Sequence, residues 1–414
     1  MLLISFFLFA VMQQPRTLEQ EANGNTSAAG GGGHVSKLPL RSLLYPGATT
    51  RIYASLMPWF GDRRHIDVGY HSDDPQQIAR QVTDMMSRGI DGAVVDWYGP
   101  DDNITSRTNE LLLRESEARN FQFAILVNGK PFRTCMQRGC DVTALLLSEL
   151  QYAEKHFEGS PVYIRWQGRP VVFFFDGNKF PIDWRRVRAV LSHSPLFVFR
   201  NTGAFDNPDS EGAFAWNAPE IANVGDPEAL QYLERFYDRA KRSPGRFVMG
   251  SVYKGFDDSR ASCGQGKRIP ENCGQTWLDT FAEINRFYSA SRQLPALLIV
   301  TWNDYEEGTA VEPGVGCLSS MTARLSGSLL TWDFKGNRNA VDRFLIFDSS
   351  DRQRLIKLGE VGAGQSSFDL RGTNLQPGDW LLVKAQAKAG MVDALSDPMK
   401  YGASNSGSGE SNPR

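Results

Sequence analysis

The chain has 414 residues, of which 41% are hydrophobic, so it has enough apolar material for two globular domains. Its 45 basic and 47 acidic side chains give a formal net charge of −2. A balance this even provides no general attraction to nucleic acid or to an anionic membrane surface, and neither is expected as a partner.

The N-terminus predicts export. Residues 1–13 hold an apolar run that is too short to cross a bilayer but has the length of a signal-peptide core. No Lys or Arg precedes the run and no small-x-small cleavage site follows it, so the signal is atypical. We expect a secreted or periplasmic protein without an integral membrane span. Residues 14–45 contain a Gly, Asn and Ser run and are expected to be a flexible linker.

Residues 46–317 are expected to form a (β/α)₈ barrel, because short β-type runs alternate with helical stretches. Several runs, such as 171–175, are continuously apolar, which is typical of strands buried on both faces. A doubly wound open sheet is the main alternative, but no Gly-rich nucleotide fingerprint follows the first strand. The eight expected strands cover residues 52–57, 92–96, 122–128, 170–175, 196–200, 213–216, 247–252 and 296–301.

Five cysteines occur along the chain. Cys135 and Cys140 lie close together, as do Cys263 and Cys273, so in an exported protein each local pair is expected to form a disulfide. Neither spacing is a CxxC and few histidines lie nearby, so no metal site is expected. Cys317 is left over and is interpreted as structural.

Residues 318–401 alternate strand signals with turns and are expected to be a small β-sandwich. The turn at 375–378 and the run after it resemble the end of a fibronectin type III-like domain, which is usually a spacer or an accessory binder. Residues 402–414 are rich in Ser, Gly and Asn and are expected to be disordered.

The ends of the expected barrel strands carry hydrogen-bonding groups and aromatic rings, which suit a hydroxyl-rich ligand. Functional residues of this fold gather at the C-terminal strand ends. For the aspartates, helix capping or a salt bridge is the alternative role, and for the tryptophans it is core packing. The expected substrate-binding residues are Trp59, Asp96, Trp97, Tyr98, Asn128, Asp176, Asn201, Trp216, Tyr253, Trp302, Asn303 and Glu312.

Asp304 and Glu307 follow the apolar run 297–300 and are the candidate catalytic pair. Glycoside hydrolysis needs two carboxyl groups, one to protonate the leaving oxygen and one to activate water or assist attack at the anomeric carbon. An i, i+3 spacing in a turn can direct both side chains to one pocket. The alternative is that Asp304 caps a helix and Glu307 completes a capping box.

A resemblance to known families covers roughly residues 50–315. The segment 301–307, Thr-Trp-Asn-Asp-Tyr-Glu-Glu, resembles the Trp-Asn-Asp-Tyr-x-Glu motif of glycoside hydrolase family 71, the endo-α-1,3-glucanases. The segment 303–313 resembles the last-strand motif of family 99, the endo-α-mannosidases and mannanases. Residues 57–61, Met-Pro-Trp-Phe-Gly, are similar to that family's first-strand pattern, and 89–98 to a second-strand segment shared by both families.

The two families imply different chemistry. Family 71 implies an inverting hydrolase of α-linked glucan, with Asp304 as general base, Glu307 as general acid and no cofactor. Family 99 has Glu at the first position, acts through the sugar's 2-hydroxyl and retains configuration. This chain has the shorter Asp304 there, which favours the family 71 chemistry. A non-catalytic carbohydrate-binding barrel, and an adhesion or spacer protein acting through its β region, are the other hypotheses.

Overall fold

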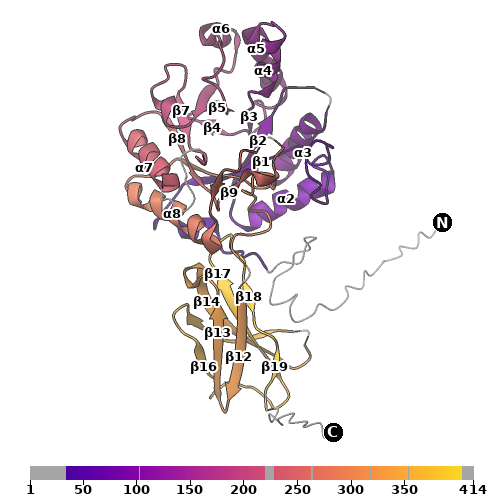
Figure 1. Cartoon of the computed structure of the whole chain (residues 1–414), viewed down its shortest axis with the longest axis vertical. Coiled ribbons are helices and arrows are strands. Elements are labelled where there is room, and N and C mark those ends of the chain that lie inside the picture. The colour runs from indigo at the N-terminus through magenta and orange to yellow at the C-terminus, as the bar shows by residue number, and fades with distance from the viewer. Residues whose placement is uncertain are drawn as a thin grey trace, which may run out of the picture. The chain divides into compact units, whose positions relative to one another are not determined.

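The computed structural model describes residues 34–101, 103–219, 228–262, 264–317, 319–352 and 354–402. They belong to two compact units (Figure 1). One unit comprises Val35–Leu318 with Ala387–Val392, and the other contains Ser319–Gln386 and Asp393–Arg414. Within the described residues no helix is both long enough and apolar enough to cross a membrane.

The first unit is a closed barrel of eight parallel strands, as predicted. β1 pairs with both β2 and β11, and β3 pairs with β5, so the sheet has no open edge and the doubly wound alternative is excluded. The barrel strands are β1 (Arg51–Leu56), β2 (Gly92–Trp97), β3 (Gln122–Val127), β5 (Arg169–Phe174), β6 (Leu196–Arg200), β7 (Gly212–Phe214), β8 (Phe247–Val252) and β11 (Ala296–Ile299).

Helices surround the barrel (Figure 1). Asp74 begins the first of them by accepting a hydrogen bond from the Gln76 amide, and Pro75 follows at a position that needs no amide donor. Their bounds are α2 (Pro75–Ser87), α3 (Ile104–Arg119), α4 (Lys130–Gln137), α5 (Val142–His156), α6 (Trp184–Val190), α7 (Glu228–Lys241) and α8 (Gln275–Phe287). Shorter elements are η1 (Leu40–Leu43), β4 (Arg165–Trp166), η2 (Thr202–Phe205), β9 (Phe256–Asp257), η3 (Asp258–Arg260), β10 (Arg268–Ile269) and η4 (Asn272–Gly274).

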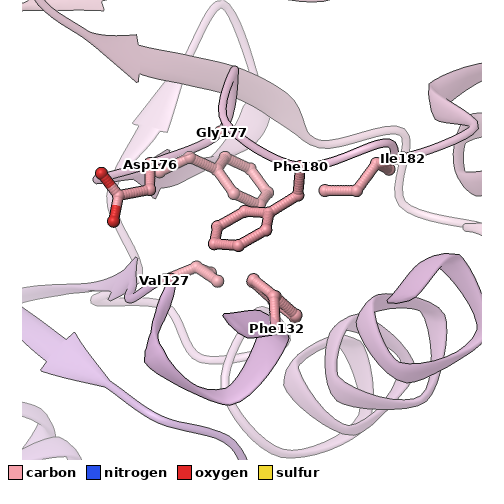
Figure 2. A pocket seen from close by; sticks show the side chains of 8 residues that line it. Val127, Phe132, Asp176, Gly177, Phe180 and Ile182 are labelled. Atoms are coloured by element: carbon pink, nitrogen blue, oxygen red, sulfur yellow. The ribbon is translucent and has the colours of Figure 1, made fainter. Parts of the chain in front are cut away.

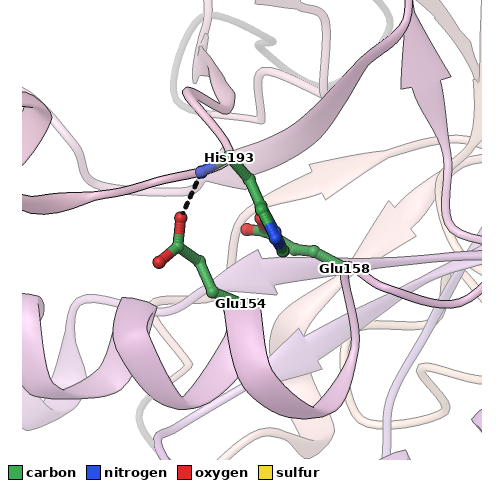
Figure 3. A group of neighbouring side chains, drawn as sticks. All are labelled: Glu154, Glu158 and His193. Atoms are coloured by element: carbon green, nitrogen blue, oxygen red, sulfur yellow. Dashed lines mark hydrogen bonds and ion pairs between the residues drawn. The ribbon is translucent and has the colours of Figure 1, made fainter.

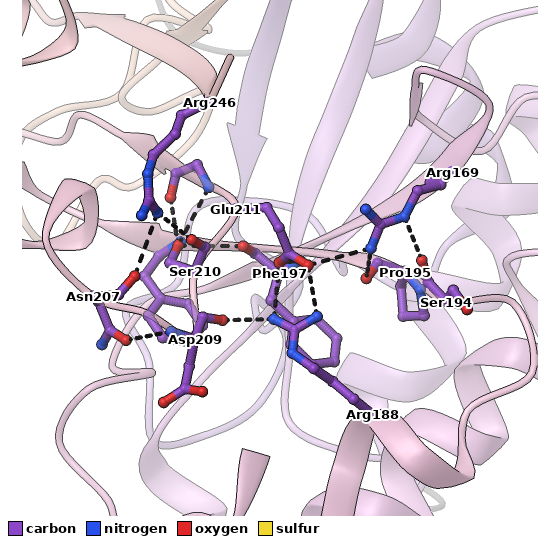
Figure 4. Close-up of polar contacts among 12 residues, drawn as sticks. Arg169, Arg188, Ser194, Pro195, Phe197, Asn207, Asp209, Ser210, Glu211 and Arg246 are labelled. Carbon is purple, nitrogen blue, oxygen red and sulfur yellow. Dashed lines mark hydrogen bonds and ion pairs between the residues drawn. The ribbon is translucent and has the colours of Figure 1, made fainter. Parts of the chain in front are cut away.

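An ion-pair network joins the N-terminal ends of β5, β6 and β7 (Figure 4). The Glu211 carboxylate, one residue ahead of β7, accepts hydrogen bonds from Arg188 at 2.6 and 2.9 Å and from Arg169 at 3.3 Å. It also accepts the Phe197 amide of β6 at 3.0 Å. One carboxylate therefore fixes the register of three neighbouring strands at the end opposite the C-terminal strand ends.

Residues 34–45 correct the expected linker, whose first part lies outside the described residues. η1 buries Leu40, and the Arg41 side chain donates hydrogen bonds to the Thr50 carbonyl at 2.9 Å and to Asp91 at 3.1 Å. Residues 34–45 are therefore not a flexible linker. The sequence prediction was dominated by the Gly-rich run upstream and did not take account of the apolar side chains that bind this segment to the barrel.

The disulfides confirm one predicted pair and correct the other. Cys135 is bonded to Cys140, as expected. Cys273 is bonded to Cys317, not to Cys263, which lies outside the described residues. Proximity in sequence was misleading because the fold brings residue 317 within a Cα–Cα distance of 4.6 Å of residue 273.

The second unit consists of antiparallel strands in two sheets, consistent with the expected β-rich region. One sheet has the order β12-β13-β16, and the other has β15-β14-β17-β18 with β19 on β17. Met321 and Leu330 of the first sheet share a buried core with Phe344, Ile346 and Val383 of the second. The strands are β12 (Ser320–Ser326), β13 (Leu329–Lys335), β14 (Val341–Ser349), β15 (Ile356–Gly362), β16 (Ser367–Asp369), β17 (Trp380–Ala387), β18 (Ala394–Leu395) and β19 (Met399–Lys400), with η5 (Arg338–Ala340) between β13 and β14.

The two disulfides should differ in their contribution to stability. Cys273–Cys317 spans 44 residues and Cys135–Cys140 spans 5. Loop-closure entropy then predicts that Cys317→Ser lowers the free energy of unfolding by about 4 kcal/mol and Cys140→Ser by about 2 kcal/mol. Guanidinium unfolding followed by tryptophan fluorescence measures both. Non-reducing peptide mapping that found a 263–273 bridge instead would contradict the assignment.

Candidate active site

The loop after β11 holds the candidate carboxylates in a tight turn. The Asp304 amide donates to Thr301 Oγ1 at 2.8 Å, and the Thr309 amide donates to the Asp304 carbonyl at 3.0 Å. Asp304 Oδ1 accepts the amides of Glu306 at 3.1 Å and Glu307 at 2.9 Å. Asp304 Oδ1 therefore accepts main-chain amides in the way that a helix-capping residue does. However, residues 304–307 form a turn and not a helix.

Burial gives the two carboxyl groups different proton affinities. Asp304 is only 5% exposed, and burial raises its pKa to about 6 while the Glu307 amide opposes that rise. Burial, together with the charges of Asp304 and Asp258, raises the pKa of Glu307 to about 8. Near neutral pH the first group is therefore ionised and the second protonated, which is the arrangement of a base beside an acid.

The Glu307 carboxyl is available for chemistry. Within the described parts of the chain its side chain makes no hydrogen bond or ion pair. Its main chain anchors it, because the Glu307 amide donates to Asp304 Oδ1 and the Glu307 carbonyl accepts the Asp257 amide at 2.8 Å. Glu306 differs, because its carboxylate accepts His65 Nδ1 at 2.9 Å and the Ile66 amide at 3.0 Å. Glu306 thus ties the last-strand loop to the loop after β1.

Three predicted residues form a hydrogen-bonded cluster beside the pair. Asp96 Oδ2 accepts the Tyr98 hydroxyl at 2.9 Å and Asn128 Nδ2 at 3.1 Å. Burial raises the pKa of Asp96 to about 7, the two hydrogen bonds lower it, and the charges of Asp304 and Asp176 raise it further. The ends of β2, β3 and β11 therefore converge on one polar site.

Asp176 is compensated by three cations. Its carboxylate lies 2.8 Å from Lys179 Nζ, 3.5 Å from an Arg133 nitrogen and 3.9 Å from an Arg200 nitrogen. Figure 2 shows this carboxylate directed away from Phe180, at the edge of a small, mainly apolar pocket. Asp176 is thus an ion-paired group on the wall of the site.

Trp59 lies beside the site among other rings, whereas Trp216 makes no ring contact with them within the described residues. Trp59 is half-buried, stacks on His65 with ring centroids 4.9 Å apart, and meets the Tyr98 ring edge-on at 6.4 Å. Trp216 is buried and meets Phe175 edge-on at 5.2 Å, so it is packed inside the protein. Both tryptophans are therefore braced by neighbouring aromatic side chains.

Trp302 and Asn303 stabilise the fold around the site. The Trp302 ring is fully buried under the Arg88 guanidinium, 4.8 Å from the ring centroid. Asn303 Oδ1 accepts the Met57 amide at 2.8 Å and its Nδ2 donates to the Met57 carbonyl at 3.0 Å. These contacts leave little of either side chain for a ligand.

Trp97 and Tyr253 are also packed inside the protein. Trp97 is 1% exposed, with the Tyr152 and Phe157 rings at centroid distances of 6.5 and 5.9 Å. Successive side chains of β2 point to opposite faces of the strand. Asp96 points toward the site, so the next residue, Trp97, points toward α5. Tyr253 is completely buried.

Asn201 and Glu312 are held by tyrosines. Asn201 Oδ1 accepts the Tyr232 hydroxyl at 2.7 Å. Glu312 accepts the Tyr70 hydroxyl at 3.0 Å and the Tyr305 hydroxyl at 2.9 Å, and burial raises its pKa. Glu312 therefore stabilises the loop after β11 through hydrogen bonds with two tyrosines.

Arg200 and Asp258 influence the site although the strand-end residues chosen from the sequence did not include them. Arg200 is the last residue of β6, and its positive charge lowers the pKa of Glu307. Including the final residue of each strand would have found it. Asp258 accepts the Gln265 and Lys267 amides at 2.9 and 2.8 Å, and this long-loop position carries no periodic signal in the sequence.

Comparisons with known proteins concern the fold. No protein-family profile matches the sequence, and no curated protein matches it significantly. A structure of the GH99 endo-alpha-mannosidase from Bacteroides thetaiotaomicron aligns with a TM-score of 0.50 and 16% identity, over 68% of this chain and 90% of that one. A second structure from that organism gives 0.49 and 15% over the same shares. A glycoside hydrolase-like protein gives 0.47 and 12%, over 71% and 91%. The chain therefore has the barrel fold seen in the endo-alpha-mannosidase.

Replacing Asn303 should destabilise the protein. Asn303→Ala removes two buried hydrogen bonds and leaves the Met57 amide and carbonyl unpaired, so we expect a loss of about 2–4 kcal/mol in the free energy of unfolding. Asn285→Ala is the matched control, since its single bond to the Leu43 carbonyl is exposed, and should cost less than about 1 kcal/mol. Equal losses in urea unfolding would contradict the framework role.

Proposed function

We propose that the protein is an endo-acting glycoside hydrolase of α-linked polysaccharide, with α-1,3-glucan as the first candidate substrate. The observation that carries the proposal is the pair of carboxyl groups of Asp304, which is buried, and Glu307, which is half-buried, whose raised pKa values differ. The pair follows the last barrel strand, at the end where active sites of this fold are built. The resemblance of residues 301–307 to the family 71 motif, and the barrel fold, also support it.

In the proposed reaction Glu307 is the general acid. It donates its proton to the glycosidic oxygen as the bond from that oxygen to the anomeric carbon breaks. Asp304 is the general base and removes a proton from water as the water attacks the anomeric carbon from the opposite face. The product is a hemiacetal of inverted configuration, and the two carboxyl groups regain their starting charges by proton exchange with solvent.

The neighbouring polar and aromatic residues would bind the sugar. The Asp96–Tyr98–Asn128 cluster presents hydroxyl, amide and carboxyl groups of the kind that pair with sugar hydroxyls. The half-buried face of Trp59 suits stacking on the apolar face of a pyranose ring. Such contacts need no cofactor.

A second candidate is a retaining endo-α-mannosidase or mannanase. The barrel likeness to the GH99 endo-alpha-mannosidase favours it, whereas the aspartate at position 304 favours inversion. Proton NMR of the first-formed product distinguishes the two, because the anomeric configuration of a fresh reducing end reports inversion or retention. Retention on α-mannan would replace the first candidate with this one.

The second unit and the N-terminus carry two subsidiary proposals. We propose that the two-sheet unit is a fibronectin type III-like accessory module, supported by its antiparallel strands and shared core. We also propose secretion, which the two disulfides support because such bonds persist in oxidising compartments.

Removing either carboxylate should abolish turnover. Asp304→Asn and Glu307→Gln are each expected to lower reducing-sugar release from α-1,3-glucan, α-1,6-mannan or starch by about 10²–10⁴-fold. Glu306→Gln is the matched control and should lose less than tenfold, because its carboxamide oxygen can still accept the Ile66 amide and its NH₂ group can donate to His65 Nδ1 in the other imidazole tautomer. No activity on any of the three polymers, with sugar binding intact, would favour a non-catalytic carbohydrate-binding barrel.

The pH dependence should be bell-shaped. Activity requires ionised Asp304, so it rises with pH through about 6, and protonated Glu307, so it falls as pH rises through about 8. The measurement is kcat/KM between pH 4 and 10. Since the charge of Asp304 raises the pKa of Glu307, that pKa should fall in Asp304→Asn, as carbon-13 NMR of labelled glutamate can report. A profile without an alkaline limb would contradict the role of Glu307.

A further inference from the structure

A cluster of three ligating side chains lies away from the candidate active site (Figure 3). Glu154 is on the last turn of α5, Glu158 lies just beyond that helix, and His193 lies in the segment between α6 and β6. One ligand atom from each residue lies within 4.8 Å of the other two. Two sequence-distant segments therefore bring two carboxylates and one imidazole together.

The three side chains are held in place before any ion binds. Glu154 accepts the His193 amide at 2.7 Å and the Ser192 hydroxyl at 3.4 Å. The Glu158 carboxylate lies 3.1 Å from His193 Nδ1. Figure 3 shows the imidazole beside the Glu158 side chain, with the main-chain nitrogen of His193 bonded to Glu154. The backbone and the ring of His193 are thus both oriented toward the cluster.

Among the three residues, Glu158 provides the evidence that the cluster binds a cation. Its side chain is completely buried, and within the described residues its Oε1 has no hydrogen-bond partner. Arg165 does not neutralise the carboxylate by direct contact, since its guanidinium donates to the main-chain carbonyls of Glu158 and Gly168. A buried oxygen of this kind calls for a positive partner.

The types of ligand atom suit zinc. Zinc binds imidazole nitrogen and carboxylate oxygen at about 2.0–2.2 Å, so neighbouring ligand atoms in a tetrahedral site are about 3.3 Å apart. The observed separation of 3.1 Å between His193 Nδ1 and the Glu158 oxygen is close to that spacing. Calcium and magnesium prefer all-oxygen ligands, so the imidazole disfavours both.

We propose that Glu154, Glu158 and His193 bind one zinc ion that stabilises the barrel. His193 lies shortly before β6, which begins at Leu196, and β6 runs from this end toward the candidate active site. The ion would therefore lie at the N-terminal end of the barrel strands. It would link the end of α5 to the start of β6. Because positions at this end of the fold contribute to stability and not to catalysis, the ion is structural and takes no part in hydrolysis.

Calorimetric titration of the untagged, metal-free full-length chain with zinc chloride tests the proposal. We expect one zinc ion per chain with a micromolar or tighter Kd, weakened at least tenfold in both Glu154→Gln and His193→Ala. His156→Ala is the matched control, because that residue ends the same helix and stacks on Tyr152 outside the cluster, and its Kd should equal that of the native chain. Glu158→Gln is avoided as the main test because its buried side chain could affect folding.

The Tm gives an independent readout. Saturating zinc should raise the Tm of the native chain and of His156→Ala by several degrees, and should leave Glu154→Gln and His193→Ala unchanged. Absence of binding to the native chain, or the same Kd and Tm increase in the two cluster variants, would overturn the proposal. Neither measurement uses hydrolytic activity, so failure here is separate from failure of the proposed enzyme function.

Discussion

Closure of the barrel between β1 and β11 is the constraint on which the candidate site depends. The first and last strands pair in parallel over residues 51–54 and 296–299, so the loops that follow them become neighbours although they are distant in sequence. The Asn303 side chain then forms hydrogen bonds with the amide and the carbonyl of Met57. The Glu306 carboxylate forms hydrogen bonds with the His65 ring and the Ile66 amide. Without this closure neither the Trp59 ring nor the Asp304–Glu307 turn would have a fixed place.

Desolvation is the second physical theme of the site. Asp304 and Asp96 are buried and Glu307 is half-buried, and for each of them desolvation is the largest cause of a raised pKa. Hydrogen bonds from main-chain amides limit the rise for Asp304, whereas neighbouring negative charges increase it for Glu307. The same loop therefore separates two chemically similar groups into an ionised and a protonated one at neutral pH. Such a division of roles needs no metal ion.

The opposite ends of the barrel use buried charge differently. At the C-terminal strand ends, Asp304 and Asp96 each accept two hydrogen bonds, whereas within the described residues the Glu307 side chain makes none. At the N-terminal ends, Glu211 is fully engaged by Arg188, Arg169 and the β6 main chain and acts as a fixed strut. The Glu158–His193 pair lies between these extremes, with one oxygen satisfied and the other without a partner. That imbalance motivates the zinc proposal, which the sequence did not suggest because residues 158 and 193 are separated by α6.

The sequence by itself determined the barrel and the position of the candidate carboxylates. Each strand is a short apolar run, and each run is followed by polar residues, so strand ends could be read directly from the local pattern. Asp304, Glu307, Asp96 and Asn128 were found in this way. Such signals are local, because they depend on neighbours within a few residues.

Only the tertiary structure decided which strand-end residues face the site and which support it. Trp97 follows Asp96 by one residue, yet the alternation of the strand sends its ring toward α5. Cys273 pairs with Cys317, and residues 35–45 join the barrel, through contacts between segments far apart in the chain. Burial and partner choice are sums over such distant contacts. A local pattern therefore specifies where a strand ends, whereas the folded chain alone specifies what each side chain meets there.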